Sequence, residues 1–377
     1  MDGRQQPSDA SIFPVKENPL VHFHDYLRLL VDKGGSDLHL KAAGPAFIRI
    51  DGELSEIHDL APLTPDDTRR FAREIMSPEL WARFESGEEA DLAYSIAGLG
   101  RFRVAVFHQR GSVGLVLRRV LSGNQSFDEL NLPPAVRKLS EEHRGLVLVT
   151  GPTGSGKTTT TAAMISHINA TRRCHIVTIE DPIEILHADN LAVVDQREVG
   201  VDTLDFKTAL RSVARQDPDV IFIGEMRDTE TVSAALQAAE TGHMVISTLH
   251  TTNATETVNR IIDLFPPHQQ HQARMSLANS LKGIVCQRLL PQVGGGRIAA
   301  IECLVMTTRL HEFLVDPDKT SQIEDAIADG AYYGMQTFDQ HLLTLYREGR
   351  ITMADALAAA TSPHDFRIAT RAAGLDT

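Results

Sequence analysis

The sequence is organised around a glycine-rich loop that follows an apolar run and precedes a helical pattern. The apolar run at 146–149 predicts a buried strand, and residues 162–168 have helical spacing. Between them, the pattern Gly-x-x-x-x-Gly-Lys-Thr extends from Gly151 to Thr158. A strand, a loop of this spacing and a helix, in this order, form the context that a P-loop requires.

The residue types of this loop are suited to binding phosphate groups. Glycines let backbone N–H groups turn inward without a Cβ in the way, and these amides bind anions together with the helix N-terminus. Lys157 can reach the β- and γ-phosphates, and the Thr158 hydroxyl can bind Mg²⁺. We therefore predict ATP and Mg²⁺ as cofactors. The predicted binding residues are Gly151, Pro152, Thr153, Gly154, Ser155, Gly156, Lys157, Thr158 and Thr159.

Composition narrows the class of protein. A length of 377 residues suggests two or three domains, and 42% hydrophobic with 23% charged residues is ordinary for a globular chain. The net charge of -13 argues against a nucleic-acid surface along the whole chain. No apolar run reaches the ~18–20 residues that span a bilayer, and the polar N-terminus does not resemble a signal peptide. We expect a cytoplasmic protein with no nucleic-acid partner and no direct membrane insertion.

The pattern changes along the chain, and this predicts two folded domains. Residues 1–18 are polar and are expected to be disordered. Residues 19–122 predict a small α+β domain, and 123–135 have the Gly, Asn, Ser and Pro content of a linker. Residues 136–377 alternate apolar strands with helices, which predicts an α/β domain with a parallel sheet covered on both faces. Its predicted strands are 146–149, 176–180, 220–224 and 244–248, and the helices between them are 206–215 and 229–240.

The part of the chain beyond these strands is predicted to be mainly helical. Residues 268–287 are expected to form one long helix, because Leu277, Leu281, Ile284 and Val285 have helical spacing. The glycines at 294–296 predict a hairpin turn whose second strand is 297–305.

Two acidic residues at predicted strand ends are candidates for catalysis. Hydrolysis of a γ-phosphate needs a water held in line and an acid that orients it or takes its proton. Glu225 follows the apolar run 220–224, and ligands bind at the carboxyl ends of parallel strands. Glu225 is therefore the first choice for the base, and with Thr158 it is a predicted Mg²⁺ ligand. Glu180, at the end of 176–180, is its rival.

Two histidines frame the predicted strand 244–248. His250 lies just past its carboxyl end, where the γ-phosphate is expected, and is predicted to hydrogen-bond phosphate during catalysis. His243 lies at the other end of the strand. It is assigned to nucleotide binding, with a purely structural role as the alternative.

Four segments together carry a resemblance to a known family. They are Gly-Pro-Thr-Gly-Ser-Gly-Lys-Thr at 151–158, Thr-Ile-Glu-Asp-Pro-Ile-Glu at 178–184, 216–228, which contains Glu225, and the histidine segment 240–251. The chain resembles the secretion-type ATPase superfamily and, within it, the type IV pilus retraction ATPases PilT and PilU. The longer extension and type II secretion ATPases usually carry a four-cysteine zinc module. This chain has only Cys174, Cys286 and Cys303, with no zinc spacing.

The resemblance implies a fold, an assembly and partners. It implies a PAS-like N-terminal domain, a RecA-like C-terminal ATPase domain and a homohexameric ring. In such rings, arginines of the N-terminal domain approach the γ-phosphate, and the matching positions here are Arg101, Arg103 and Arg118. The implied function is ATP hydrolysis that powers or assists pilus retraction and twitching motility. The implied partners are a PilT-type ATPase and the inner-membrane platform protein PilC, at the cytoplasmic base of the pilus.

Two segments favour the PilU branch. PilT has Ala-Ile-Arg-Asn-Leu-Ile-Arg-Glu before its last helices, whereas 309–316 here is Arg-Leu-His-Glu-Phe-Leu-Val-Asp. The segment 109–120 also looks more like PilU. An alternative function is an ATP-binding regulatory partner of a PilT-type motor with little turnover of its own. A nucleic-acid translocase is disfavoured by the net charge and by the lack of an aromatic and basic stripe.

Overall fold

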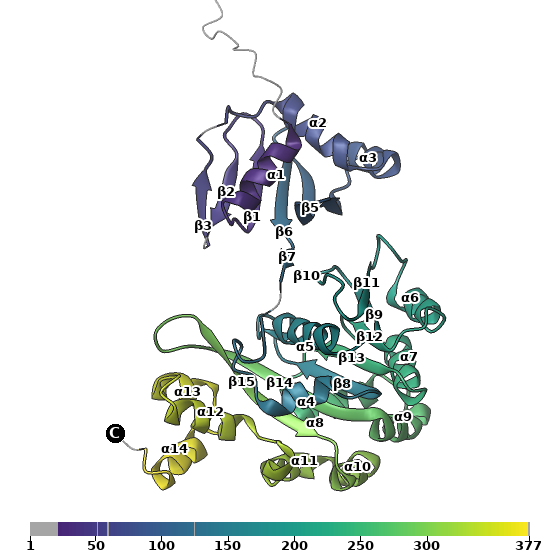
Figure 1. Ribbon diagram of the computed structural model, residues 1–377, viewed down its shortest axis with the longest axis vertical. Helices are drawn as coiled ribbons and strands as arrows, with labels where there is room; N and C mark the ends of the chain where they lie inside the picture. The colour runs from purple at the N-terminus through teal and green to yellow at the C-terminus, as the bar shows by residue number, and fades with distance from the viewer. Residues whose placement is uncertain (1–21, 51, 59, 124, 376–377) are drawn as a thin grey trace, which may run out of the picture. The chain divides into compact units, whose positions relative to one another are not determined.

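Two compact units make up the chain, which passes from one to the other between Leu121 and Ser122. The computed structural model describes residues 22–50, 52–58, 60–123 and 125–375 (Figure 1). The predicted disordered segment 1–18 lies outside the described residues. Within the described ranges, no helix is both long and apolar enough to cross a bilayer.

The first unit is an antiparallel sheet with helices packed on it (Figure 1). Its six strands have the order β3-β2-β1-β6-β5-β4. Aromatic and aliphatic side chains of α1 and α2, such as Tyr26 and Phe71, are buried together with alternate residues of the strands. The strands are β1 (Asp37–Lys41), β2 (Phe47–Ile50), β3 (Glu53–Glu56), β4 (Ala90–Ile96), β5 (Gly100–Gln109) and β6 (Ser112–Arg119), and the helices are α1 (Phe23–Asp32), α2 (Pro65–Ile75) and α3 (Pro78–Glu85).

The second unit is built on a seven-stranded sheet in the order β11-β9-β12-β13-β8-β14-β15. All neighbouring strands are parallel except β14 and β15, which are antiparallel. The four predicted strands are confirmed as β8, β9, β12 and β13, while β11 was not predicted. Three short elements are not part of this sheet: the strands β7 (Leu121–Ser122) and β10 (Ile185–Leu186), and the helix α4 (Pro134–Ser140). The sheet strands are β8 (Gly145–Thr150), β9 (His175–Glu180), β11 (Val193–Glu198), β12 (Val220–Ile223), β13 (Met244–Leu249), β14 (Leu281–Pro291) and β15 (Arg297–Val305).

Helices cover both faces of this sheet, as its buried strands require. On one face, α4 and α5 pack against Val147 and Val149 of β8. On the other face, Leu146 and Leu148 pack among residues of α6 to α9. The same core includes side chains of the C-terminal helices. The helices are α5 (Lys157–Thr171), α6 (Phe206–Val213), α7 (Thr229–Glu240), α8 (Ala254–Asp263), α9 (Pro267–Ser280), α10 (Thr308–Val315), α11 (Ile323–Ala328), α12 (Phe338–Arg347), α13 (Met353–Ala359) and α14 (Pro363–Ala372), with short 3₁₀ turns at Pro317–Gln322 and Ala331–Tyr333.

The prediction of one helix over 268–287 is wrong. Helix α9 ends at Ser280, and Leu281, which has extended backbone angles, is the first residue of β14, the strand between β8 and β15. The helical spacing of Leu281, Ile284 and Val285 is coincidental, because both faces of this strand are buried. Pairing with strands far away in the sequence decides the conformation here, as it often does for short apolar runs.

Gly283 offers a test of this strand. A Cβ at this position would lie 2.6 Å from Leu139 Cδ1 and 2.7 Å from the backbone oxygen of Leu304. We expect Gly283→Ala to lower the free energy of unfolding by about 1–3 kcal/mol, the usual cost of overpacking a tight site. Chemical denaturation measures this change. Gly44→Ala is the control, since its new methyl group would meet only the flexible Lys41 side chain, at 3.2 Å, and an equal loss in both variants would contradict the explanation.

Candidate functional site

The loop after β8 has the backbone form that phosphate binding requires. Gly151 has φ 147°, and a Cβ there would lie 2.5 Å from both the Gln287 carbonyl oxygen and Ser155 Oγ. Gly156, at φ 92°, immediately precedes α5, which begins at Lys157. The loop therefore delivers its backbone to the N-terminus of a 15-residue helix, where unpaired N–H groups attract anions.

Lys157 is folded back over its own loop. Its Nζ donates to the carbonyl oxygens of Gly151 at 2.7 Å and Pro152 at 3.2 Å. Burial lowers the pKa of this amine, while the charges of Glu225 and Glu184 oppose the effect. Phosphate oxygens are stronger acceptors than these carbonyl groups, since they are charged. The amine is thus held ready to exchange its acceptors for phosphate.

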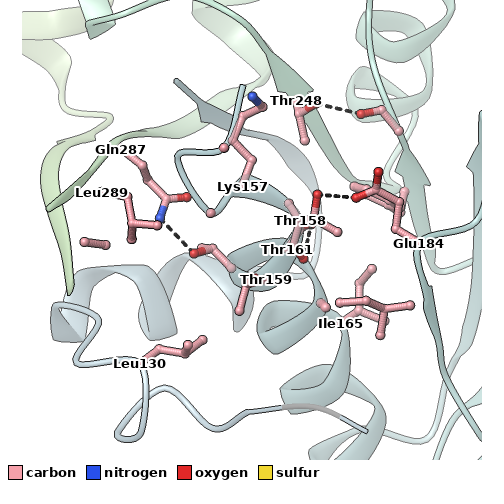
Figure 2. Close-up of a pocket in the computed structure, with 18 of the residues that line it drawn as sticks. Leu130, Lys157, Thr158, Thr159, Thr161, Ile165, Glu184, Thr248, Gln287 and Leu289 are labelled. Atoms are coloured by element: carbon pink, nitrogen blue, oxygen red, sulfur yellow. Dashed lines mark hydrogen bonds between the residues drawn. The ribbon is translucent and has the colours of Figure 1, made fainter. Parts of the chain in front are cut away.

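Thr158 lies beside a carboxylate of the segment that follows β9. Its Oγ1 donates to Glu184 Oε2 at 2.5 Å (Figure 2). A hydroxyl and a carboxylate in one cavity are hard oxygen ligands of the kind that Mg²⁺ prefers, with phosphate and water oxygens completing its shell. The residues present therefore fit a Mg²⁺ ion next to the loop.

Glu225 contacts two side chains, one of them an arginine, at the carboxyl edge of the sheet. It accepts from Arg227 Nη2 at 2.7 Å, and its Oε1 lies 3.3 Å from His250 Nε2. Burial raises the pKa of Glu225, but the bonds from Arg227 and His250 outweigh it, so the pKa lies below its usual value. Thr248 Oγ1 donates to Gly224 O at 2.7 Å, which ties the ends of β12 and β13 together (Figure 2). Glu225 and His250 thus lie together, as an ionised carboxylate and a neighbouring imidazole.

Glu180 has a different environment. The residue is only 7% exposed, and its carboxylate accepts from Thr178 Oγ1 at 2.7 Å and from Gln196 Nε2 at 3.2 Å. Burial raises its pKa, and these bonds oppose the rise without cancelling it. Glu180 also accepts from the backbone of Glu184 at 3.4 Å. Glu180 therefore helps to hold the turn at 180–184, and the assignment of Glu225 rather than Glu180 as the base stays a prediction.

One cavity of about 680 Å³ brings the loop, both acids and His250 together. Part of its lining comes from segments without a sequence signal. Gln287 on β14 donates Nε2 to Thr160 Oγ1 at 2.9 Å (Figure 2). Residues 129–132 of the predicted linker also line the cavity, because Phe127 is buried against the second unit and holds this segment there. Further lining residues that were not predicted are Gln125, His187, Arg227, Gln292 and Arg297.

The remaining predicted residues lie elsewhere. His243 is at the amino end of β13, and its Nδ1 lies 3.0 Å from Ala238 O at the end of α7. This contact is of the kind that a purely structural role would have. Nucleotide binding by His243 stays a prediction. Arg101 and Arg103 lie on β5 and Arg118 on β6 of the first unit. Arg118 Nε donates to Asp37 Oδ1 at 2.7 Å, and the role of these arginines toward phosphate stays a prediction.

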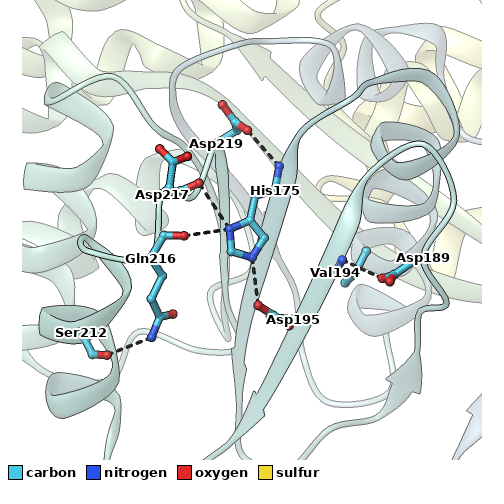
Figure 3. Close-up of polar contacts among 8 residues, drawn as sticks. All are labelled: His175, Asp189, Val194, Asp195, Ser212, Gln216, Asp217 and Asp219. Atoms are coloured by element: carbon cyan, nitrogen blue, oxygen red, sulfur yellow. Dashed lines mark hydrogen bonds and ion pairs between the residues drawn. The ribbon is translucent and has the colours of Figure 1, made fainter.

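A second polar cluster positions β12 from the opposite end of the sheet. His175 begins β9, and its ring nitrogens lie 2.9 Å from Gln216 O and 3.0 Å from Asp195 Oδ2 (Figure 3). The His175 backbone N–H donates to Asp219 Oδ2 at 2.9 Å. These bonds hold the segment that leads into β12, the strand after which Glu225 follows.

Comparison with known proteins identifies the family. The family model described as "Type II/IV secretion system protein" matches residues 28–358. The chain belongs to this family. PilT of Pseudomonas aeruginosa, a type IV pilus retraction ATPase, is 43% identical over 342 residues, which cover 91% of this chain and 99% of PilT. The type IV pilus ATPase PilU of the same organism is 43% identical over 349 residues, which cover 92% of this chain and 91% of PilU. The predicted relation to PilT and PilU is confirmed.

Solved structures agree with this relation. The crystal structure of the pilus retraction motor PilT with bound ADP has a TM-score of 0.84 and 45% identity, and the match covers 92% of this chain and 98% of that chain. The ATPase DotB of Legionella pneumophila has a TM-score of 0.71 and 26% identity over 91% of this chain and 96% of that chain. The predicted fold class, a RecA-like P-loop domain preceded by a PAS-like α+β domain, is confirmed. Equal identity to PilT and PilU does not separate the two branches.

Proposed function

We propose that this chain is an ATP-hydrolysing motor of a type IV pilus machine, which powers or assists pilus retraction. The observation that carries the proposal is the convergence of Lys157, Thr158, Glu225 and His250 on one cavity. A phosphate-binding amine, a hydroxyl for a metal and an ionised acid near an imidazole are the groups that hydrolysis of a triphosphate needs. The similarity to PilT, whose structure holds ADP, supports nucleotide binding here.

Each residue has a proposed task. The loop amides and Lys157 bind and neutralise the β- and γ-phosphates. Thr158 and Glu225 would hold Mg²⁺, with the Glu184 carboxylate beside the Thr158 hydroxyl as a further oxygen ligand. The bound ion would supply charge neutralisation at the phosphates. Glu225 orients the attacking water, and His250 bonds the γ-phosphate or the leaving phosphate. The low pKa of Glu225 keeps its carboxylate charged at neutral pH, as this task requires.

The assembly and its partners are part of the same proposal. We infer a cytoplasmic homohexamer at the inner-membrane base of the pilus, which acts with the platform protein PilC and a PilT-type ATPase. In this ring, Arg101, Arg103 and Arg118 would neutralise γ-phosphate charge, since a guanidinium pairs with phosphate oxygens bidentately. The segments 109–120 and 309–316 support assignment to the PilU branch rather than to PilT.

The test combines turnover with oligomer mass. We expect the purified chain to release phosphate from ATP and to have the mass of six chains when ATP and Mg²⁺ are present. Phosphate release and mass photometry measure these properties, and added DNA is expected to leave the rate unchanged. Tight ATP binding without turnover, together with co-purification of a PilT-type ATPase, would favour the regulatory alternative. Absence of both binding and turnover would refute the proposal.

A further inference from the structure

Three buried side chains form a row across three neighbouring strands, starting at the last residue of the strand that precedes the P-loop. Thr150, the last residue of β8, is the register partner of Cys286 on β14, which is in turn the partner of Glu302 on β15. Their exposed fractions are 0%, 0% and 5%. On either side of Glu302, the same face of β15 carries Ala300 and Leu304, which belong to an apolar core. A carboxylate in such a row needs a polar partner to offset its loss of hydration.

The polar partner of Glu302 is a backbone N–H group at the start of a helix on another segment of the chain. Glu302 Oε1 accepts from the backbone N–H of Ala254 at 2.8 Å. Ala254 is the first residue of α8, which packs on β14 and β15. The first N–H groups of a helix have no partner within the helix, and a negative charge there is favourable. The Glu302 carboxylate therefore holds the beginning of α8 against the sheet.

The beginning of α8 is joined to His250 by only three residues. Their bonds stay within the segment and its helix: Thr252 N donates to Glu256 Oε2 at 2.7 Å, and Thr251 Oγ1 lies 2.7 Å from Thr257 Oγ1. These hydrogen bonds tie the segment 251–253 to α8, so we expect the two to move together. The bond from Ala254 to Glu302 connects them to a strand 48 residues further along the chain.

We propose that Glu302 is a positioning residue for the ATPase site: by accepting the Ala254 amide it fixes the segment 251–253, and so the distance between His250 and Glu225. The inference rests on the proposed function, because the site that Glu302 positions is the proposed ATPase site. Glu302 itself takes no part in the chemistry. The inference assigns to this buried carboxylate the alignment of the imidazole. The cost of burying the charge is offset by the helix start that it holds.

The charge on Glu302 is sensitive to pH. Burial raises the pKa of its carboxyl to about 7, although the bond from Ala254 N opposes the rise. The titratable and charged groups near it are Cys286 and Arg288 on β14, Glu324 on α11, and Cys303, the next residue on β15, whose side chain lies on the opposite face of the strand. Because the pKa is raised, the carboxylate is charged above about pH 7 and loses its charge below. The hold on α8 should therefore weaken as the pH falls through 7.

Two variants and two readouts test the proposal. In Glu302→Ala, we expect kcat for ATP to fall about tenfold with KM changed by less than about threefold, since the P-loop is intact. Amide hydrogen exchange of residues 251–257 should rise about tenfold in the same variant. Glu302→Gln should be intermediate in both, because its amide oxygen accepts without a charge. Corrected for intrinsic rates, exchange should rise from pH 8 to pH 6 in the wild type and stay level in Glu302→Gln.

A matched control separates this role from loss of packing. Cys303→Ala removes a fully buried side chain from the opposite face of β15, and it should leave kcat and exchange at 251–257 unchanged. Equal exchange at 251–257 in wild type, Glu302→Ala and Glu302→Gln would overturn the proposal, and so would an equal kcat loss in Cys303→Ala. If Glu302→Ala does not fold, the Glu302→Gln comparison decides. A wild type without ATP turnover would refute the proposed function, while the exchange measurements would still judge the role of Glu302.

Discussion

Replacing Lys157 with alanine is expected to lower kcat/KM for ATP by about a thousandfold. The amine is the cation of the loop, and its Nζ already faces inward at 2.7 Å from Gly151 O. Without it, the phosphates would lie beside Glu225 and Glu184 with their negative charge uncompensated. Nucleotide affinity should fall as well, since the lysine contacts ground state and transition state alike. Phosphate release and fluorescent-nucleotide titration measure the two effects.

The control for this variant is Lys319→Ala. Lys319 lies in a 3₁₀ turn and its amine is 3.3 Å from Asp316 Oδ2 at the surface. The Lys319→Ala substitution removes the same charge from the chain as Lys157→Ala does. We expect its ATP turnover to lie within about twofold of the wild-type rate. Near-normal nucleotide binding by Lys157→Ala would show that the phosphates bind elsewhere.

Glu225→Gln is expected to lower kcat by about 10²–10⁴-fold while ATP still binds. The amide keeps the shape of the side chain but can neither take a proton nor hold a charge. It also loses the charge-assisted bonds with Arg227 and His250. Single-turnover phosphate release separates this step from binding and product release.

Two further variants interpret that result. Glu180→Gln should cost less in kcat than Glu225→Gln, because the Glu180 carboxylate is occupied by hydrogen bonds from Thr178 and Gln196. Glu230→Gln on the surface of α7, where the glutamate pairs with Lys207 at 3.7 Å, should have little effect. A larger loss in Glu180→Gln than in Glu225→Gln would exchange the two roles.

The candidate site was predictable where its chemistry is local in the sequence. The loop at 151–158 lies between a fully apolar strand and a helix, and each of its residues has one task, so Lys157 and Thr158 could be assigned directly. Glu225 and His250 follow apolar strands of a parallel sheet, whose carboxyl ends lie along one edge. Their proximity, 3.3 Å in the structure, follows from that rule and from the neighbouring order of β12 and β13.

Other parts of the site could not be predicted, because their positions depend on partners far away in the chain. Gln287 was placed on a helix by its local pattern, yet it lies on β14 and contacts Thr160 of α5. Residues 129–132 have the composition of a linker and line the cavity only because Phe127 is buried against the second unit. Arg227 lies within the segment 216–228, but its bond to Glu225 became evident only in the structure.

The amino-acid sequence alone was sufficient to predict the P-loop, the parallel sheet and the acids at its edge, because each depends on periodicity or spacing within about a dozen residues. Only the tertiary structure decided which glutamate pairs with His250, which strand lies between β8 and β15, and that Glu302 holds the start of α8. Those outcomes depend on hydrogen bonds and burial between residues tens of positions apart, and no local pattern encodes such contacts.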